Sequence, residues 1–426
     1  MGKPKLRWMR LDNAAKIYPA ARRQNWSNVF RLSMTLKEPV DKAVLQSALD
    51  VTVGRFPSIA ARLRRGMFWY YLQQLDCAPR LMEESSYPMT RMSHAEIRRC
   101  AFRVLVYDKR IALELFHSLA DGNGAMVFLK SLVAEYLQQK YHIDVPAENG
   151  VVDRLEAPAE EELEDSFQKH GTYLSAGRGG KTAWQIAGTP EADGFLHVTC
   201  FRMSVKAVLQ KAHEYGVSMT AYLCAVMMMA LQNLQQEQVP DRDKRKPVKL
   251  MIPVNLRNLF PSKTLRNFAM YTTPELLTKL GHYDFAEIVK IVHHCMGLEI
   301  TPKQMSMKIQ ANISNERLMA VKIMPLFLKN IIMKAVFDAV GERKSCLSFS
   351  NLGAIKLPEV MYDYVERMDF ILGVQATSPY NCGCLSFGDD LHINFIRNIR
   401  QPELERHFYQ VLHEQGLTVE VQSNQR

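Results

Sequence analysis

A histidine and an aspartate four residues apart mark the stretch of the chain with the clearest potential for chemistry. The sequence IALELFHSLADGNGAMVFLK contains His117, Asp121 and Gly122 at the point where an alternating apolar pattern becomes a helical one. An imidazole with a pKa near neutrality can accept a proton from a hydroxyl or an amine during nucleophilic attack. A carboxylate four residues later can orient that ring or pair with a cation. The alternative is that His117 is an ordinary histidine at the end of a strand.

The elements expected around the motif favour a functional loop. Two alternating apolar runs flank residues 108–110 and predict a β-hairpin whose second strand ends at His117. Helical spacing begins just after the motif. Loops between a strand and a helix commonly carry functional residues, and Gly122 and Gly124 permit backbone angles closed to other residues. We therefore expect a tight strand-to-helix turn that presents His117.

A later strand supplies the expected partner of Asp121. The stretch VKLMIPVNLRNLF is almost continuously apolar and closes with Arg257. An arginine at the end of an apolar strand needs either a counter-charge or open water. We predict that Arg257 pairs with Asp121, joins two parts of the chain and holds the His117 loop, so that Asp121 does not share the proton.

The pattern of elements indicates an α/β or mixed α+β protein with two domains. A chain of 426 residues is long for one domain, and strand and helix patterns alternate in both halves. Residues 146–194 hold an acidic run followed by small and glycine-rich residues, which is typical of a linker. We predict an N-terminal subdomain over residues 1–180 and a C-terminal subdomain over residues 194–426.

Composition narrows the possible partners. The formal net charge of +10 would suit nucleic acid, an anionic membrane, or a ligand or partner that carries phosphate or acidic groups. The basic residues form small dispersed groups, for example over residues 62–65 and 98–99, without a nucleic-acid-binding motif, and we expect no nucleic-acid partner. The eight cysteines form neither a CxxC pair for zinc nor a disulfide framework, so we expect reduced thiols and no metal.

The apolar stretches predict no transmembrane helix. The longest run, MTAYLCAVMMMAL, is shorter than the roughly 20 residues that span a bilayer, and the N-terminus lacks the apolar core of a signal peptide. A longer stretch from Leu318 carries Lys322, Lys329 and Lys334. It could lie on a membrane surface, but we expect it to pack on its own protein with the lysine stems reaching outward. The expected location is cytoplasmic.

Three segments together resemble the superfamily of acyltransferases that includes chloramphenicol acetyltransferase and condensation domains. These segments are HSLADGNGA, IPVNLRN and FSNLG, and the likeness runs from LDNAAKIYPA to FIRNI. Within the superfamily the chain is most similar to bacterial alcohol-acetyltransferase-like and polyketide-associated-protein-type members. The resemblance implies two similar subdomains, each a mixed sheet flanked by helices, with an active-site tunnel between them.

The resemblance also implies a reaction and its residues. An acyl group would pass from a thioester of coenzyme A or of an acyl carrier protein to an alcohol or amine acceptor, with no metal and no tightly bound cofactor. His117 matches the general base of the family, and Asp121 matches the carboxylate that pairs with an arginine at the position of Arg257. Ser350 and Asn351 fall where a donor to the tetrahedral oxyanion would lie.

Two departures and two alternatives accompany this interpretation. Many members carry a second histidine before the motif, where this chain has Phe116, and the DFGWG element of plant acyltransferases has no match. One alternative is a catalytically silent binding module with the same fold. The other is a lipid or polyketide acyltransferase that associates with a membrane surface. The acceptor, the acyl length, the donor-binding residues and the oligomeric state stay open at this point.

Overall fold

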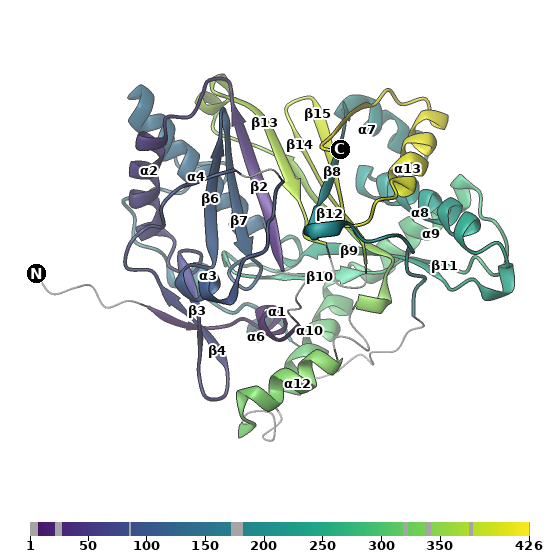
Figure 1. The fold of residues 1–426 in the computed structure, drawn as a ribbon, viewed down its shortest axis with the longest axis horizontal. Helices are drawn as coiled ribbons and strands as arrows, with labels where there is room; N and C mark the ends of the chain where they lie inside the picture. The colour runs from purple at the N-terminus through teal and green to yellow at the C-terminus, as the bar shows by residue number, and fades with distance from the viewer. Residues whose placement is uncertain are drawn as a thin grey trace, which may run out of the picture.

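Each half of the chain builds a β-sheet flanked by helices, and the two sheets lie side by side (Figure 1). The computed structural model describes residues 7–21, 28–84, 87–171, 182–317, 323–336, 342–374 and 378–425. Strands and helices are mixed in both halves, which confirms the predicted fold class. The proposed boundary near residue 180 lies outside the described residues, and the two subdomain ranges stay a prediction.

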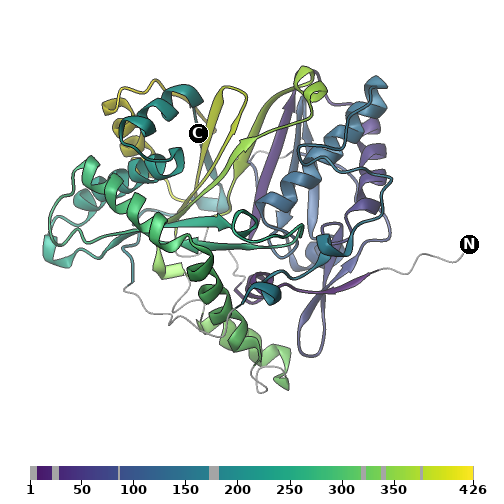
Figure 2. The same cartoon turned by 180° about the vertical axis from the view of Figure 1, so that it is seen from behind.

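The first sheet has five strands and carries the predicted hairpin. Its order across the sheet is β13 (Val365–Ile371), β2 (Val29–Leu36), β7 (Arg110–Phe116), β6 (Phe102–Tyr107) and β5 (Met82–Glu83). Neighbouring strands are antiparallel except β5 and β6. Two helices, α2 (Lys42–Arg55) and α4 (Gly122–Tyr141), pack against each other over one face (Figures 1 and 2). Because β7 ends at Phe116, the sheet fixes where the backbone of His117 begins.

The second sheet has eight strands and mixes parallel and antiparallel pairs. Its order is β10 (Ala269–Thr272), β9 (Val248–Asn255), β12 (Leu347–Ile355), β14 (Tyr380–Phe387), β15 (Asp390–Arg397), β8 (His197–Ser204) and β16 (Glu420–Ser423), with β11 (Glu275–Leu276) also paired to β9. The strand β12 runs parallel to both of its neighbours. The flanking helices are α7 (Val205–Glu214), α8 (Met219–Gln238), α9 (Phe285–Glu299) and α13 (Glu403–Glu414).

The remaining elements lie at the end of the molecule below the two sheets in Figure 1. A small sheet orders β1 (Trp8–Arg10), β4 (Tyr70–Gln74) and β3 (Ala61–Arg65). The helices are α1 (Ile17–Ala21), α3 (His94–Arg99), α5 (Glu160–Leu163), α6 (Phe167–His170), α10 (Pro302–Arg317) and α12 (Leu326–Val336). Of these, α12 contacts α1, and α10 contacts α6.

Each half has its own apolar core, and consecutive methionines on α8 help to fill one of them. The side chains of Met227 and Met228 on α8 are fully buried among the apolar residues of the second half. The eight cysteines are free thiols. Among the described helices no single one is long and apolar enough to cross a membrane, and one bent pair, α7 with α8, meets that test by length and composition only.

Candidate active site

The HxxxDG motif forms the predicted turn from strand to helix. Asp121 is the N-cap of α4, and its Oδ1 accepts a hydrogen bond from the backbone N–H of Gly124 at 3.1 Å. The reason for the glycines differs from the prediction, because neither Gly122 nor Gly124 has a positive φ. A Cβ on Gly124 would lie 1.9 Å from the carbonyl oxygen of Leu265, and a Cβ on Gly122 would lie 2.8 Å from Leu352. Close approach of a backbone carbonyl, not backbone angle, requires glycine at position 124, whereas the leucine side chain beside Gly122 could move aside.

An asparagine fixes the tautomer of His117. The Oδ1 of Asn267 lies 3.1 Å from Nδ1 of His117. The amide nitrogen of Asn267 donates to Oδ2 of Asp12 at 3.2 Å and to the carbonyl oxygen of His117 at 3.0 Å. Both of those partners are acceptors, so the amide nitrogen must face them and the amide oxygen must face the ring. Nδ1 therefore carries the proton, and Nε2 keeps its lone pair.

Aromatic rings pack around the imidazole, and its burial favours the neutral form. The ring of His117 stacks on Tyr18 with centroids 4.5 Å apart, and Phe30 packs against it at 5.0 Å. Burial lowers the pKa of His117 below its ordinary value of 6.5, because a desolvated imidazolium is unfavourable. The bond to its own carbonyl, the carboxylates of Asp121 and Asp12, and the bond to Asn267 oppose this shift. The neutral ring is the form that can act as a base.

Behind Asn267 lies a buried acid that the sequence did not single out. Asp12 is fully buried, accepts from the N–H of Ala15 at 2.7 Å, and lies 3.7 Å from Nη2 of Arg266. Burial raises the pKa of Asp12, although Arg266 opposes that shift. The only sequence signal was an acid inside the segment LDNAAK and an asparagine inside LRNFAM. Neither shows that the two meet at His117.

The structure brings Asp121 and Arg257 together. Nη1 of Arg257 donates to Oδ2 of Asp121 at 2.8 Å, and the same oxygen accepts from the N–H of Phe268 at 2.9 Å. The other guanidinium N–H groups donate to the carbonyl oxygens of Thr264 at 2.9 Å and Arg266 at 2.6 Å. Both oxygens of Asp121 are therefore occupied by backbone and guanidinium donors. Its carboxylate holds the loop, and Asn267 is the partner of the imidazole.

A cavity of about 890 Å³ lies between the two halves, where the resemblance implies a tunnel. His117 and Gly122 line it from the first half, and Met251, Tyr271 and Ser350 line it from the second. Its size is within the range of pockets that take small organic ligands. His117 thus lines a space that the two halves form together.

The two residues predicted as oxyanion donors differ in what they can still bind. Ser350 and Asn351 lie on β12 and both line the cavity. The amide of Asn351 donates to Oγ1 of Thr220 at 3.0 Å and accepts from the N–H of Gly353 at 2.8 Å, so it is committed to the protein. Within the described ranges no protein group bonds the hydroxyl of Ser350. Ser350 is the better candidate donor.

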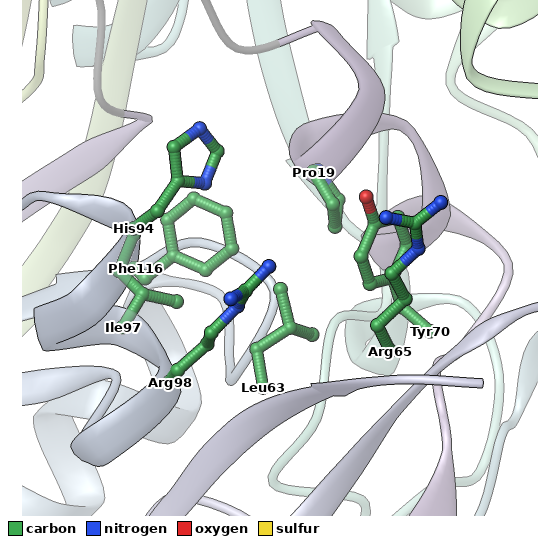
Figure 3. Close-up of a pocket in the computed structure, with 8 residues that line it drawn as sticks. All are labelled: Pro19, Leu63, Arg65, Tyr70, His94, Ile97, Arg98 and Phe116. Atoms are coloured by element: carbon green, nitrogen blue, oxygen red, sulfur yellow. The ribbon is translucent and has the colours of Figure 1, made fainter. Parts of the chain in front are cut away.

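A second, smaller cavity of about 280 Å³ lies beside Phe116 (Figure 3). Its apolar lining includes Leu63 and Phe116, while Arg65 and Arg98 extend from opposite walls. These arginines belong to two of the basic groups that are dispersed in the sequence, and the packing of α3 beside β3 brings them together. His117 does not line this cavity. It is a separate cationic feature of the surface.

One cluster contains residues of the kinds that bind metals, but an arginine forms an ion pair with its carboxylate. Ligand atoms of Cys200, Asp369 and His392 lie within 4.8 Å of one another. Arg367 lies among them, and its Nη2 donates to Sγ of Cys200 at 3.0 Å and to Asp369 at 2.9 Å. The guanidinium supplies the positive charge that a metal would bring. His392 takes part in this buried polar cluster, in line with a structural role.

Comparisons with known proteins identify the fold. No protein-family model matches the chain, and no curated protein sequence matches it. Among solved structures, TRI101 from F. sporotrichioides in complex with coenzyme A and T-2 has a TM-score of 0.64 at 11% identity, over 97% of this chain and 99% of that one. The first condensation domain of the calcium-dependent antibiotic synthetase, bound to a substrate analogue, has a TM-score of 0.60 at 14% identity, over 98% and 100%.

A third similar structure is TRI3, a trichothecene 15-O-acetyltransferase from Fusarium sporotrichioides. Its TM-score is 0.60 at 10% identity, over 97% of this chain and 98% of that one. Structural similarity at identities this low shows that the architectures are alike. The activity has to be argued from the residues of the site. The resemblance read from the motifs is confirmed at this level: the chain has the fold that condensation domains share with the acyltransferases of the chloramphenicol acetyltransferase type.

Proposed function

We propose that the protein transfers an acyl group from a thioester to an alcohol or an amine, with His117 as the general base. One observation carries the proposal. The network of Asp12 and Asn267 sets the proton on Nδ1 of His117, which leaves the lone pair on Nε2, and His117 lines the cavity. The proposal therefore rests on a fixed tautomer together with the position of His117 on a ligand-sized space.

In the proposed reaction, His117 accepts and returns the one proton that has to move. Nε2 of His117 takes the proton of the acceptor hydroxyl or amine as its oxygen or nitrogen attacks the thioester carbonyl. The hydroxyl of Ser350 donates to the oxyanion that forms. When the carbon–sulfur bond breaks, the thiolate takes the proton back from Nε2–H. No covalent acyl-enzyme forms, and the Nδ1–H bond to Asn267 persists throughout.

A coenzyme A thioester is the donor we favour. One neighbour in the fold was solved with coenzyme A, and another is an O-acetyltransferase. The net charge of +10 suits a donor that carries phosphates. A thioester on an acyl carrier protein is the alternative donor, since condensation domains share the fold.

Substitution of the base tests the proposal. We expect His117→Ala to lower transfer by about 10²–10⁴-fold, because the acceptor then loses its general base. The measurement is product formation from acetyl-, longer acyl- and carrier-bound thioesters against a panel of alcohols and amines, with detection by mass because thiols would disturb a thiol-reactive readout. His213→Ala, an exposed histidine on α7, is the matched control and should keep full activity.

Two results would contradict the proposal. Near-wild-type turnover by His117→Ala would remove the role of the base. Binding of acyl thioesters by the wild-type chain without transfer to any acceptor would instead indicate the silent binding module.

A further inference from the structure

Helix α12 presents several large apolar side chains to the solvent and buries one of its lysines, which is unusual for a surface helix. The exposed fractions are 59% for Phe327 and 63% for Ile331, whereas Lys329 is 2% exposed. Nζ of Lys329 donates to the carbonyl oxygen of Phe68 at 2.8 Å and lies 3.6 Å from the centre of the Trp69 ring. The expectation that this lysine reaches outward was wrong. Lys329 gains a cation–π contact with Trp69 and a hydrogen bond to a backbone carbonyl, whereas its apolar neighbours stay in the solvent.

The exposed face of α12 continues onto the β3–β4 hairpin. The N–H of Leu326 donates to the carbonyl oxygen of Met67 at 3.0 Å, which places the tip of the hairpin against the start of the helix. Figures 1 and 2 show the helix and the hairpin projecting at the same end of the molecule. The apolar patch, as we name it, consists of the exposed residues Met67, Phe68, Ile323, Phe327, Leu328, Ile331 and Ile332. Exposed apolar surface of this kind marks a contact with a partner or a membrane.

The border of the apolar patch is cationic. Residues 61–75 hold three arginines and no acid, and α12 holds two lysines and no acid. Arg65, two residues before the tip, and Lys334, near the end of α12, are exposed, and neither has an acidic partner in the described part of the chain. Arg65 also lines the small cavity toward which Arg98 extends (Figure 3).

We propose that the apolar patch docks on an anionic lipid membrane. The acyl region of a bilayer would take up the apolar side chains, and anionic headgroups would meet Arg65 and Lys334. A second copy of the chain fits less well, because a twofold contact through the patch would set these cations against their own copies. The docked surface lies close to the candidate site, since α12 contacts α1 and Tyr18 of α1 stacks on His117.

Vesicle co-sedimentation tests this inference. We expect the wild-type chain to bind phosphatidylcholine vesicles that contain about 30% phosphatidylglycerol, and to bind pure phosphatidylcholine at least several-fold less. The double variant Phe327→Glu/Ile331→Glu should lose binding by about tenfold or more, because two charged groups would have to enter the lipid. The matched control is Leu280→Glu, which alters a residue that is 68% exposed and lies outside the patch; it should bind like wild type.

Charge variants and the catalytic variant complete the experiment. Arg65→Gln/Lys334→Gln should weaken binding by a few-fold and flatten its dependence on salt. His117→Ala should bind like wild type, so that failure of membrane binding and failure of the proposed acyl transfer are distinguishable. All the substituted patch residues are exposed, so thermal melts should be unchanged.

Three outcomes would overturn the inference. The first is a wild-type chain that does not sediment with the anionic vesicles. The second is equal loss of binding by Leu280→Glu and by the patch variant. The third is self-association that the patch variant abolishes while vesicles have no effect, which would assign the patch to a second copy.

Discussion

The most informative residue of the site, Asn267, does not line the cavity. Its amide links the imidazole of His117 to the buried carboxylate of Asp12, which in turn lies 3.7 Å from Arg266. The amide cannot rotate without setting its NH₂ group against the Nδ1–H of the ring and its oxygen against a carboxylate. Asn267 therefore sets the tautomer of His117, and in the proposed reaction it would act as a positioning residue that supports the imidazolium.

A change at Asn267 should alter the pH profile as well as the rate. The neutral ring is active and burial lowers the pKa of His117, so wild-type kcat/KM should fall only below about pH 6.5, as the ring gains a proton. Asn267→Leu removes a bond that favours the imidazolium. We expect this variant to lose about 10–100-fold in kcat/KM and to move the acid limb to lower pH.

The same reasoning gives the sign of the stability effect. Because the pKa of His117 is lower in the folded state than in the unfolded state, its contribution to stability is present above about pH 6.5 and is lost as the pH falls from there through the folded value.

The kinetic prediction for Asn267→Leu has a clear contrary outcome. A pH profile of kcat/KM with a lower plateau and an unmoved acid limb would show that Asn267 has only a packing role.

At the scale of elements, the candidate site depends on one loop that passes directly over the first turn of α4. The loop of residues 264–268 supplies Arg266 and Asn267 to the network of His117, and the N–H of Phe268 binds Asp121. The absence of a side chain at Gly124 allows the carbonyl of Leu265 to lie against the helix. Helix cap and loop are therefore one structural unit.

A methyl group at Gly124 should push the loop of residues 264–268 away from the first turn of α4. The Cβ of Gly124→Ala would lie 1.9 Å from a backbone oxygen, which cannot move without displacing the loop. We expect a loss of about 2 kcal/mol or more in the free energy of unfolding, together with a loss of activity. Urea unfolding and turnover are the measurements.

Gly54→Ala is the matched control for this substitution. Gly54 lies in α2, and a Cβ there meets nothing within 4 Å. This change should leave activity intact and raise stability by up to about 1 kcal/mol, as alanine is the better helix former. Equal effects of the two substitutions would show that the close approach at Gly124 does not matter.

At the scale of the whole molecule, the two halves of the sequence are interlocked. The strand β13 lies late in the chain but pairs with β2 in the first sheet. Asp12 of the first half meets Arg266 of the second, and Asp121 meets Arg257. The cavity between the halves therefore keeps its shape through contacts that only the complete chain can make.

The Asp121–Arg257 pair should be coupled energetically across the halves. Both side chains are almost completely buried, and removal of one partner leaves an uncompensated charge inside the protein. We expect Asp121→Ala and Arg257→Ala each to lower the free energy of unfolding by about 3 kcal/mol, and the double variant to lose clearly less than the sum.

A surface pair provides the control. Lys263 and Glu161 lie 3.0 Å apart and are largely exposed, so Glu161→Ala should leave the melting curve unchanged. Additive losses in the Asp121–Arg257 cycle would show that the two residues act independently.

The local patterns of the sequence predicted a large part of this structure. The hairpin before the motif, the helix after it and the pairing of Arg257, which lies in the turn just after β9, all follow from periodicity and from the cost of an unpaired buried charge. Ser350 and Asn351, predicted as oxyanion donors, both line the cavity beside His117, and their role stays a prediction. These features depend on residues that are close in sequence or on a strong rule of pairing.

Features that depend on contacts between distant segments were decided only by the tertiary structure. The roles of Asp12 and Asn267 and the close approach at Gly124 each need a partner between 141 and 255 residues away, which no local pattern specifies. Which face of α12 turns toward the protein also depended on contacts between distant segments. Its sequence allows either face to turn inward, and Trp69 and the carbonyl of Phe68 bind Lys329 and leave Phe327 and Ile331 in the solvent. The sequence by itself determined which residues could do chemistry, and long-range packing determined which atoms of those residues are free to do it.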